Sequence, residues 1–314
     1  MKQSDKPRVL VMMATYNGEK YVAEQIESIL AQKEVAVTLC ISDDGSSDET
    51  ISICRSFEKN HPNIIFKLNE KNKGVSKNFM DMVYDAETDN FDYFSFSDQD
   101  DYWKPEKLIA AVRRLSKYED EPALYYSDVM NVDADLTNNR TNIYFPYFAL
   151  EDKPYIPLMV NWVLGCTMVF NKNMAKILQL YKKESFLRFH DSWVHLIAST
   201  CGKCVPENKE SYILRRISSE NVLGEKDLTL NPGRLFRAFL SLFSCNHHIT
   251  ETLVDLKKGY KNFIKPERLI EIDDLIRMRC SFKQRILIAT NHYVAVPSKK
   301  ETILLKCRVV FNLL

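Results

Sequence analysis

Three carboxylates follow an aromatic and apolar run in the first third of the chain. Residues 91–96 read FDYFSF and predict a buried strand, and Asp98, Asp100 and Asp101 come directly after it. Like charges this close repel one another unless a cation or a solvated turn offsets the repulsion. Mg²⁺ takes oxygen ligands of this kind, often one or two carboxylates together with substrate phosphates. The pattern is therefore open between a metal site and a polar turn that leads into a helix near Pro105.

The elements that must position these carboxylates alternate between strand and helix patterns along the chain. Short apolar runs at residues 9–14, 35–41 and 63–68 predict strands, and apolar residues at helical spacing follow each run. The alternation predicts an α/β fold with a doubly wound, mainly parallel sheet, in which ligands bind beyond the carboxyl ends of the strands. Polar clusters at 15–19, 42–48 and 98–101 each follow a predicted strand. These three clusters are therefore expected to form one site at one edge of the sheet.

The remaining elements extend this pattern to about residue 228. We expect a strand at 124–127, a long lid or binding loop at 131–157, and a segment at 161–170 that leads into a strand. Helices follow from about Asn173 and from 189–193, where Asp191 is either a helix cap or a functional group. The predicted domains are residues 1–228 and a mainly helical region at 229–314. G-x-G-x-x-G and G-x-x-x-x-G-K-[ST] motifs are absent, which argues against a dinucleotide fold and a P-loop.

Composition narrows the classes of partner. The chain has 43 basic and 42 acidic residues, a balance that argues against nucleic-acid binding. Neither an export signal nor a run of about 20 apolar residues is found, so we expect a cytoplasmic protein without a membrane-spanning helix. Eight cysteines are present, and the spacing of Cys201 and Cys204 fits half a zinc site, a redox motif or, as we expect, structural thiols.

Two C-terminal segments leave alternatives open. Residues 231–243 place apolar side chains such as Phe236 and Phe239 on one helical face and Arg234 and Arg237 on the other. This pattern fits a helix docked on the core or one that lies on an anionic membrane surface. Residues 302–314 are apolar at alternate positions, and their pattern does not separate strand from helix.

The motifs together resemble family 2 inverting glycosyltransferases with the GT-A fold, in particular rhamnosyltransferase-like bacterial enzymes of surface-polysaccharide synthesis. The resemblance extends from about Arg8 to about Gly224, and it implies a nucleotide-binding half at about 1–128 and an acceptor-binding half at about 129–228. It rests on the order and placement of short motifs, which read ATYNG (14–18), SDDGSSD (42–48), NKGVS (72–76), SDQDDYW (97–103), GCT (165–167) and HD (190–191). The Q-x-x-R-W signature of processive synthases is absent, so we expect transfer of a single sugar.

The resemblance implies roles for individual residues. Asp191 would be the catalytic base, and Asp98 and Asp100 would form a D-x-D element that holds Mg²⁺ or Mn²⁺ against the diphosphate of a dTDP- or UDP-sugar. The implied nucleotide-binding residues are Thr15, Tyr16, Asn17, Glu19, Asp43, Asp44, Lys73, Gly74, Asp98 and Gln99. The residues expected near the acceptor or the diphosphate are Trp162, Gly165, Cys166, Thr167, His190, Trp193, Arg215, Arg216 and Ser218.

The sequence departs from the family pattern after the base helix. A Tyr-Arg-Gln-His-Gly-x-Asn-like segment is usual there, whereas residues 215–221 read RRISSEN and place Ser218 at the histidine position. Arg215 and Arg216 are expected to supply cationic contacts instead. The expected acceptor is a saccharide or a lipid-linked saccharide, with a peripheral membrane contact and a homodimer left open. Two rival functions are a sugar-nucleotide nucleotidyltransferase and a catalytically silent nucleotide-sugar-binding subunit.

Overall fold

The computed structural model describes residues 6–137, 145–187, 189–216 and 248–314. The chain divides into two compact units. Unit 1 contains Met1–Phe145, Val163–Ala198 and Gly202–Ile217, and unit 2 contains Pro146–Trp162, Ser199–Cys201 and Ser218–Leu314. The domain boundary predicted between residues 228 and 229 lies outside the described residues, so it stays a prediction.

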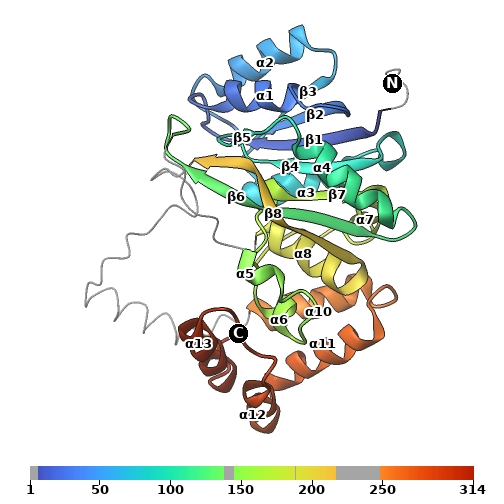
Figure 1. The fold of residues 1–314 in the computed structure, drawn as a ribbon, viewed down its shortest axis with the longest axis vertical. Helices are drawn as coiled ribbons and strands as arrows, with labels where there is room; N and C mark the ends of the chain where they lie inside the picture. The colour runs from blue at the N-terminus through green and yellow to red at the C-terminus, as the bar shows by residue number, and fades with distance from the viewer. Residues whose placement is uncertain (1–5, 138–144, 188, 217–247) are drawn as a thin grey trace, which may run out of the picture. The chain divides into compact units, whose positions relative to one another are not determined.

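An eight-stranded sheet forms the centre of unit 1, with the strand order β3-β2-β1-β4-β7-β6-β8-β5 (Figure 1). β3, β2, β1 and β4 run parallel to one another. β7 is antiparallel to β4 and to β6, β8 is parallel to β6, and β5 is antiparallel to β8. The strands are β1 (Arg8–Thr15), β2 (Ala36–Asp43), β3 (Ile64–Leu68), β4 (Tyr93–Ser97), β5 (Tyr102–Trp103), β6 (Ala123–Val132), β7 (Val169–Asn171) and β8 (Lys203–Arg216). The predicted α/β class is confirmed.

Helices follow the parallel strands in the predicted alternation. They are α1 (Val22–Leu30), α2 (Thr50–Asn60), α3 (Val75–Asp85), α4 (Lys107–Leu115), α7 (Lys172–Gln179) and α8 (His190–Cys201), with the short 3₁₀ segments η2 (Thr88–Asn90), η3 (Ser116–Tyr118) and η4 (Gly165–Thr167). The apolar stripe of α1, with Val22, Ile26 and Ile29, is completely buried. All five residues of β4 are buried as well, as expected of a strand covered on both faces. The core therefore holds the ends of β1, β2 and β4 in place.

The structure corrects several boundaries. β6 continues beyond the predicted 124–127 because it pairs along its length with β8, a strand that the sequence did not predict. The short strand β5 was also not predicted. The expected long loop at 131–157 contains two short helices, α5 (Phe145–Phe148) and α6 (Ile156–Met159). α1 begins after Tyr21, and Asn17, in the loop before it, accepts a hydrogen bond of 2.8 Å from the backbone N–H of Ser47.

Unit 2 is helical in its described C-terminal part. α10 (His248–Tyr260), α11 (Pro266–Met278), α12 (Phe282–Thr290) and α13 (Lys299–Val310) pack in sequence, each against the next. Leu253, Ile272 and Val309 are among the residues that are completely buried there. Ser298 caps α13 through a hydrogen bond from Glu301 N, so most of the ambiguous segment 302–314 is helix. A mainly helical C-terminal region is thus observed for residues 248–314.

Two further predictions can be compared with the structure. Within the described ranges, no helix has both the length and the apolar character needed to cross a bilayer. Neither Cys201 nor Cys204 forms a disulfide bond with another described residue. The amphipathic segment at 231–243 lies outside the described residues, so its docked and membrane-bound alternatives stay open.

Candidate functional site

The three predicted polar clusters converge at the carboxyl edge of the parallel strands. Thr15 at the end of β1 is in register with Asp43 at the end of β2, and Met13 of β1 is in register with Ser97 of β4. The loops that follow these strands therefore leave the sheet side by side. They carry most of the residues predicted to bind the nucleotide and the metal.

Asp43 organises the first two loops. Its carboxylate accepts hydrogen bonds from the Thr15 hydroxyl (2.7 Å), from the Gly45 N–H (3.1 Å), and from the N–H (2.8 Å) and hydroxyl (2.7 Å) of Ser46. Four hydrogen bonds fill the acceptor capacity of a carboxylate. The side chain is completely buried. Asp43 therefore fixes the shape of the loop, and its predicted contact with a nucleotide stays a prediction.

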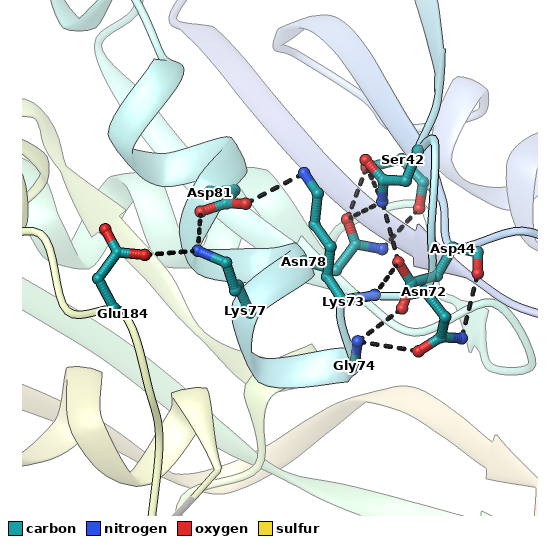
Figure 2. A network of polar contacts seen from close by, with 10 residues as sticks. Ser42, Asp44, Asn72, Lys73, Gly74, Lys77, Asn78, Asp81 and Glu184 are labelled. Atoms are coloured by element: carbon teal, nitrogen blue, oxygen red, sulfur yellow. Dashed lines mark hydrogen bonds and ion pairs between the residues drawn. The ribbon is translucent and has the colours of Figure 1, made fainter.

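Asp44 joins the β2 loop to the segment that precedes α3 (Figure 2). Its Oδ1 accepts from the Lys73 N–H (2.8 Å) and the Asn69 amide (3.1 Å), and its Oδ2 accepts from the Gly74 N–H (2.8 Å). Gly74 has a φ of +80°, a conformation that favours glycine. The Asn72 amide donates to the backbone oxygen of Asp44 at 3.1 Å. Three of these contacts engage the carboxylate, which leaves it capacity for about one more donor.

The ammonium group of Lys73 lies in an ion-pair chain in the same view (Figure 2). Asp81 accepts from Lys73 Nζ at 3.1 Å and from Lys77 Nζ at 3.2 Å, and Lys77 also pairs with Glu184 at 3.1 Å. Burial acts most strongly on the pKa of Asp81 and would raise it, but the hydrogen bonds from the two lysines outweigh burial and lower it. The predicted nucleotide contact of Lys73 therefore requires this pair to open.

The loop after β1 is tied to the D-x-D loop by Gln99. Its amide accepts from the Tyr16 N–H at 2.9 Å and donates to the Tyr16 backbone oxygen at 3.0 Å. The Tyr16 side chain is 51% exposed. Glu19 accepts from the Glu49 N–H at 2.9 Å and so connects this loop to the start of α2. Asn17 and Glu19 are exposed as well, but their side chains accept hydrogen bonds from backbone N–H groups, so the Tyr16 ring is the most open group of this loop.

The three carboxylates after β4 lie in a protein environment that disfavours their ionised forms. Burial, then the charge of Asp100 and, more weakly, that of Asp191 raise the pKa of Asp98 to about 7, although the charge of Arg215 opposes the shift. Burial also raises the pKa of Asp100, against the charges of Arg215 and Arg216. The side chain of Asp98 is still partly exposed. A bound cation would relieve this repulsion, which is the electrostatic signature expected of a metal site.

Arg216 holds the backbone of this loop. Its guanidinium donates to the backbone oxygens of Asp100 (2.9 Å) and Asp101 (3.3 Å) and to that of Ala134 (3.0 Å), and it pairs with Glu24. The side chain is 2% exposed and lies over the Tyr21 ring. Arg216 is therefore a positioning residue for the loop. Arg215 is partly exposed, and its charge acts on all three carboxylates. Its contact with the diphosphate stays a prediction.

A buried polar cluster beneath the loop was not predicted. Lys107 is 1% exposed, donates to the Ser95 hydroxyl at 2.9 Å, and lies 3.1 Å from the centre of the Trp103 ring. Burial lowers the pKa of Lys107 well below its ordinary value, against the charges of Cys166, Asp101 and Asp98. Burial also raises the pKa of Asp101 well above its usual range. A lysine on the otherwise apolar face of α4 was the available sequence signal.

Asp191 lies in the first turn of α8 and acts electrostatically on Asp98. It is partly exposed, and it accepts a hydrogen bond from the backbone N–H of Ser192. His190 is buried, stacks on Phe79 at 4.1 Å between ring centres, and has no hydrogen-bond partner for either ring nitrogen among the described residues. Burial lowers the pKa of His190 to about 3, so the ring is neutral near pH 7. The α8 terminus thus brings a carboxylate near the D-x-D loop.

The remaining predicted acceptor residues are mostly buried. Thr167 donates its hydroxyl to the Leu164 backbone oxygen at 2.8 Å, and Trp193 packs with the Lys183 ammonium 5.0 Å from its ring centre. Cys166 is 1% exposed, and the ligand atoms of Cys166, Asp98 and Asp101 lie within 4.8 Å of one another. Trp162 belongs to unit 2 and is 3% exposed there. Ser218 lies outside the described residues.

The donor set fits Mg²⁺ or Mn²⁺. Asp98 and Asp100 supply hard carboxylate oxygens, and the raised pKa values of both show that added positive charge would be favourable there. Asp98 is partly exposed, which allows a metal to reach it. These two residues are therefore the candidates to hold a metal.

Comparison with solved structures identifies the fold as GT-A. S. aureus TarS residues 1–349 in complex with UDP-GlcNAc matches with a TM-score of 0.56 at 15% identity, over 96% of this chain and 90% of that one. The mannosyltransferase PcManGT from Pyrobaculum calidifontis, in complex with GDP-Man and Mn²⁺, matches with a TM-score of 0.57 at 14% identity, over 99% of this chain and 88% of that one. The predicted GT-A fold is confirmed.

The chain belongs to glycosyltransferase family 2, because the family model described as Glycosyl transferase family 2 matches residues 10–176, more than half of the sequence. The dTDP-rhamnosyl transferase RfbG of Shigella flexneri is 37% identical over 167 residues, which are 51% of this chain and 54% of that protein. Chondroitin synthase of Escherichia coli is 30% identical over 147 residues, 46% of this chain and 20% of the synthase. The chain thus matches about half of the first relative's length and a fifth of the second's.

Proposed function

We propose that this protein transfers a single sugar from a nucleotide diphosphate sugar to a saccharide or lipid-linked saccharide acceptor, with inversion at the anomeric carbon. The observation that carries the proposal is the cluster of carboxylates beyond the carboxyl ends of the parallel strands, where Asp100 and Asp191 lie near enough for their charges to raise the pKa of Asp98. The proposed role is in cell-surface polysaccharide synthesis at the cytoplasmic face of the membrane. The similarity to a dTDP-rhamnosyl transferase favours dTDP-rhamnose as the donor, with a UDP-sugar as the second choice.

The proposed base is Asp191. Its carboxylate takes the proton from an acceptor hydroxyl as that oxygen attacks the anomeric carbon, and the bond from the anomeric carbon to the diphosphate breaks. Attack from the face opposite the leaving group inverts the anomeric centre, through a transition state of the oxocarbenium type. Arg215 is proposed to stabilise the negative charge on the departing diphosphate.

Asp98 and Asp100 are proposed to hold Mg²⁺ or Mn²⁺, which would neutralise charge on the diphosphate. The exposed ring of Tyr16 and the remaining acceptor capacity of Asp44 are proposed to contact the nucleoside. Thr15, Asn17, Glu19, Asp43 and Gln99 shape these loops through hydrogen bonds within the protein.

The test is a donor panel assay that follows release of nucleoside diphosphate, with and without acceptor and with EDTA. We expect acceptor-dependent release from one donor, lost in EDTA. Asp191→Asn should retain donor binding by calorimetry and lose transfer by at least about a hundredfold. Asp120→Asn, at an exposed carboxylate, is the matched control and should keep full activity.

Other outcomes would contradict the proposal. Release of pyrophosphate from a nucleoside triphosphate incubated with a sugar 1-phosphate would indicate a nucleotidyltransferase. Tight nucleotide binding without turnover of any donor would indicate a silent binding subunit. Wild-type activity in Asp191→Asn would remove Asp191 from the role of base. An α-configured product from an α-linked donor would exclude inversion.

A further inference from the structure

Two neighbouring helices of unit 2 expose apolar side chains to solvent. Phe282 and Leu287 of α12 are each 61% exposed, and Ile286 on the same helix is also exposed. Each residue of an α-helix turns about 100° from the one before. Phe282 and Ile286 are therefore neighbours on the helix surface, and Leu287 lies about 100° further round the helix than Ile286. The exposed side chains form a stripe that faces away from the buried Ile288 and is bordered by the buried Ala289.

α13 repeats this arrangement. Ile303 is 64% exposed, Leu304 and Cys307 are exposed, and Phe311, in the turn that ends the helix, is 60% exposed. Ile303, Cys307 and Phe311 are four residues apart and so follow one another along a single face, whereas Leu305 and Val309 are buried on the other. α12 and α13 pack against each other (Figure 1). Arg285 of α12 donates to the Val310 backbone oxygen of α13 at 3.4 Å.

Charge around these two stripes is strongly positive. Residues 279–314 contain one acidic residue, Glu301, and seven basic residues, which are Arg279, Lys283, Arg285, Lys299, Lys300, Lys306 and Arg308. The whole chain has 43 basic and 42 acidic residues, so the rest of the sequence has an acidic excess. The positive charge is therefore concentrated on the segment that exposes the apolar side chains.

The basic residues of α13 border its apolar stripe. Lys299 and Lys300 are exposed at the start of the helix, and helical spacing places Lys306 on one side of the Ile303–Phe311 face and Arg308 on the other. Both flanking side chains are partly buried. Long basic side chains in such positions pack their methylene groups along apolar surface and reach outward with their charge.

We propose that α12 and α13 form a docking surface for an anionic lipid membrane. Apolar side chains at this surface would enter the boundary between headgroups and acyl chains, and the surrounding lysines and arginines would contact anionic headgroups. α12 and α13 contain 9 and 12 residues, too few to span a bilayer, so they would lie along the membrane interface. A second protein copy would bring the same seven basic residues together, which charge repulsion disfavours. This docking surface is independent of the proposed sugar transfer.

The test is sedimentation of the full-length protein with vesicles of phosphatidylcholine, alone or mixed with an equal part of phosphatidylglycerol. We expect binding to the mixed vesicles that high salt weakens. Leu287→Ser combined with Phe311→Ser should weaken binding by at least about tenfold through lost apolar contact. Lys299→Glu combined with Lys300→Glu should weaken binding to mixed vesicles by at least about tenfold. Ile270→Ser, at a 64% exposed residue of α11, is the matched control and should bind as the wild type does.

Several outcomes would overturn the proposal. The first is failure of the wild-type protein to bind the mixed vesicles, and the second is equal binding by the α12–α13 variants. Loss of binding in Phe236→Ser combined with Phe239→Ser, with no loss in the α12–α13 variants, would assign the contact to the segment at 231–243. Self-association of the wild type that the Leu287→Ser and Phe311→Ser changes abolish, without vesicle binding, would identify an interface between copies.

Discussion

Replacing Arg216 with methionine should destabilise unit 1 and weaken the D-x-D site. The guanidinium donates to the backbone oxygens of Asp100, Asp101 and Ala134, and the side chain is 2% exposed. Hydrogen bonds from charged groups contribute about 1.5–3 kcal/mol each, but the three share one side chain and are not additive. Removal of one partner from a buried charged network costs about 3–5 kcal/mol. The Glu24 side chain is 45% exposed and can be solvated when its partner is removed, so we expect a loss of stability near the lower end, about 3 kcal/mol.

A loss of about 3 kcal/mol corresponds to a fall in Tm of roughly 6–12 °C for a unit of this size. Thermal and urea unfolding followed by circular dichroism would measure it. We also expect weaker Mn²⁺ binding by calorimetry, because the loop that carries Asp98 and Asp100 loses its anchor. Arg216→Lys should recover part of both losses, since an ammonium group reaches some of the same oxygens.

The matched control is Arg113→Met. Arg113 pairs with Glu34 at 2.8 Å, but both side chains are more than half exposed, so the loss should stay below about 1 kcal/mol. The reasoning would be refuted if Arg216→Met unfolded within about 2 °C of the wild type. A large loss of stability with unchanged Mn²⁺ binding would refute the positioning role alone.

Three further predictions concern the same site. Asp98→Asn should raise the Tm in EDTA at pH 8 but not at pH 4. The pKa of Asp98 is about 7 in the folded protein and 3.8 in the unfolded chain, so the wild-type protein loses stability as the pH rises between these two values. His190→Phe should reduce the fall in Tm between pH 6.5 and 4. Burial lowers the pKa of His190 to about 3, so the wild-type folded state loses stability as the pH falls below about 6.5. An unchanged dependence of Tm on pH would contradict this. Gly165→Ala would place a methyl group 2.7 Å from His190 Nε2 and 3.6 Å from Asp191 Cβ. We expect the free energy of unfolding in urea to fall by about 1–3 kcal/mol and kcat to fall at least about tenfold. A wild-type kcat would show that Asp191 is not displaced.

The strand-end clusters could be predicted from sequence because they depend on local pattern. An apolar run that stops at Thr15, Asp43 or Ser97 marks the end of a buried strand, and parallel strands place such ends at one edge. β8 could not be predicted in the same way. Its residues include Pro206 and a polar stretch from Glu207 to Glu210, and its position depends on pairing with the distant β6.

Residue type alone also did not show what each carboxylate contacts. Asp43 and Asp44 are adjacent and equally suited to bind a ligand, but backbone and hydroxyl donors fill the capacity of Asp43 and leave some at Asp44. Arg216 was expected at the diphosphate, and its buried guanidinium instead holds backbone oxygens. Such distinctions depend on atoms brought together by folding, which the spacing of residues along the chain does not specify.

The pairing of Gln99 with Tyr16 also links two motifs that are far apart in sequence. A Cβ atom at Gly18 would lie 2.2 Å from Gln99 Oε1, so the Gln99 side chain occupies space that only glycine leaves open at that position. Asparagine at 99 would be one methylene short of Tyr16, and glutamate would lose the amide donor. The middle residue of the D-x-D element is thus coupled to the loop after β1. Among homologous chains, residues 18 and 99 should covary, and a larger residue at 18 should accompany a shorter one at 99.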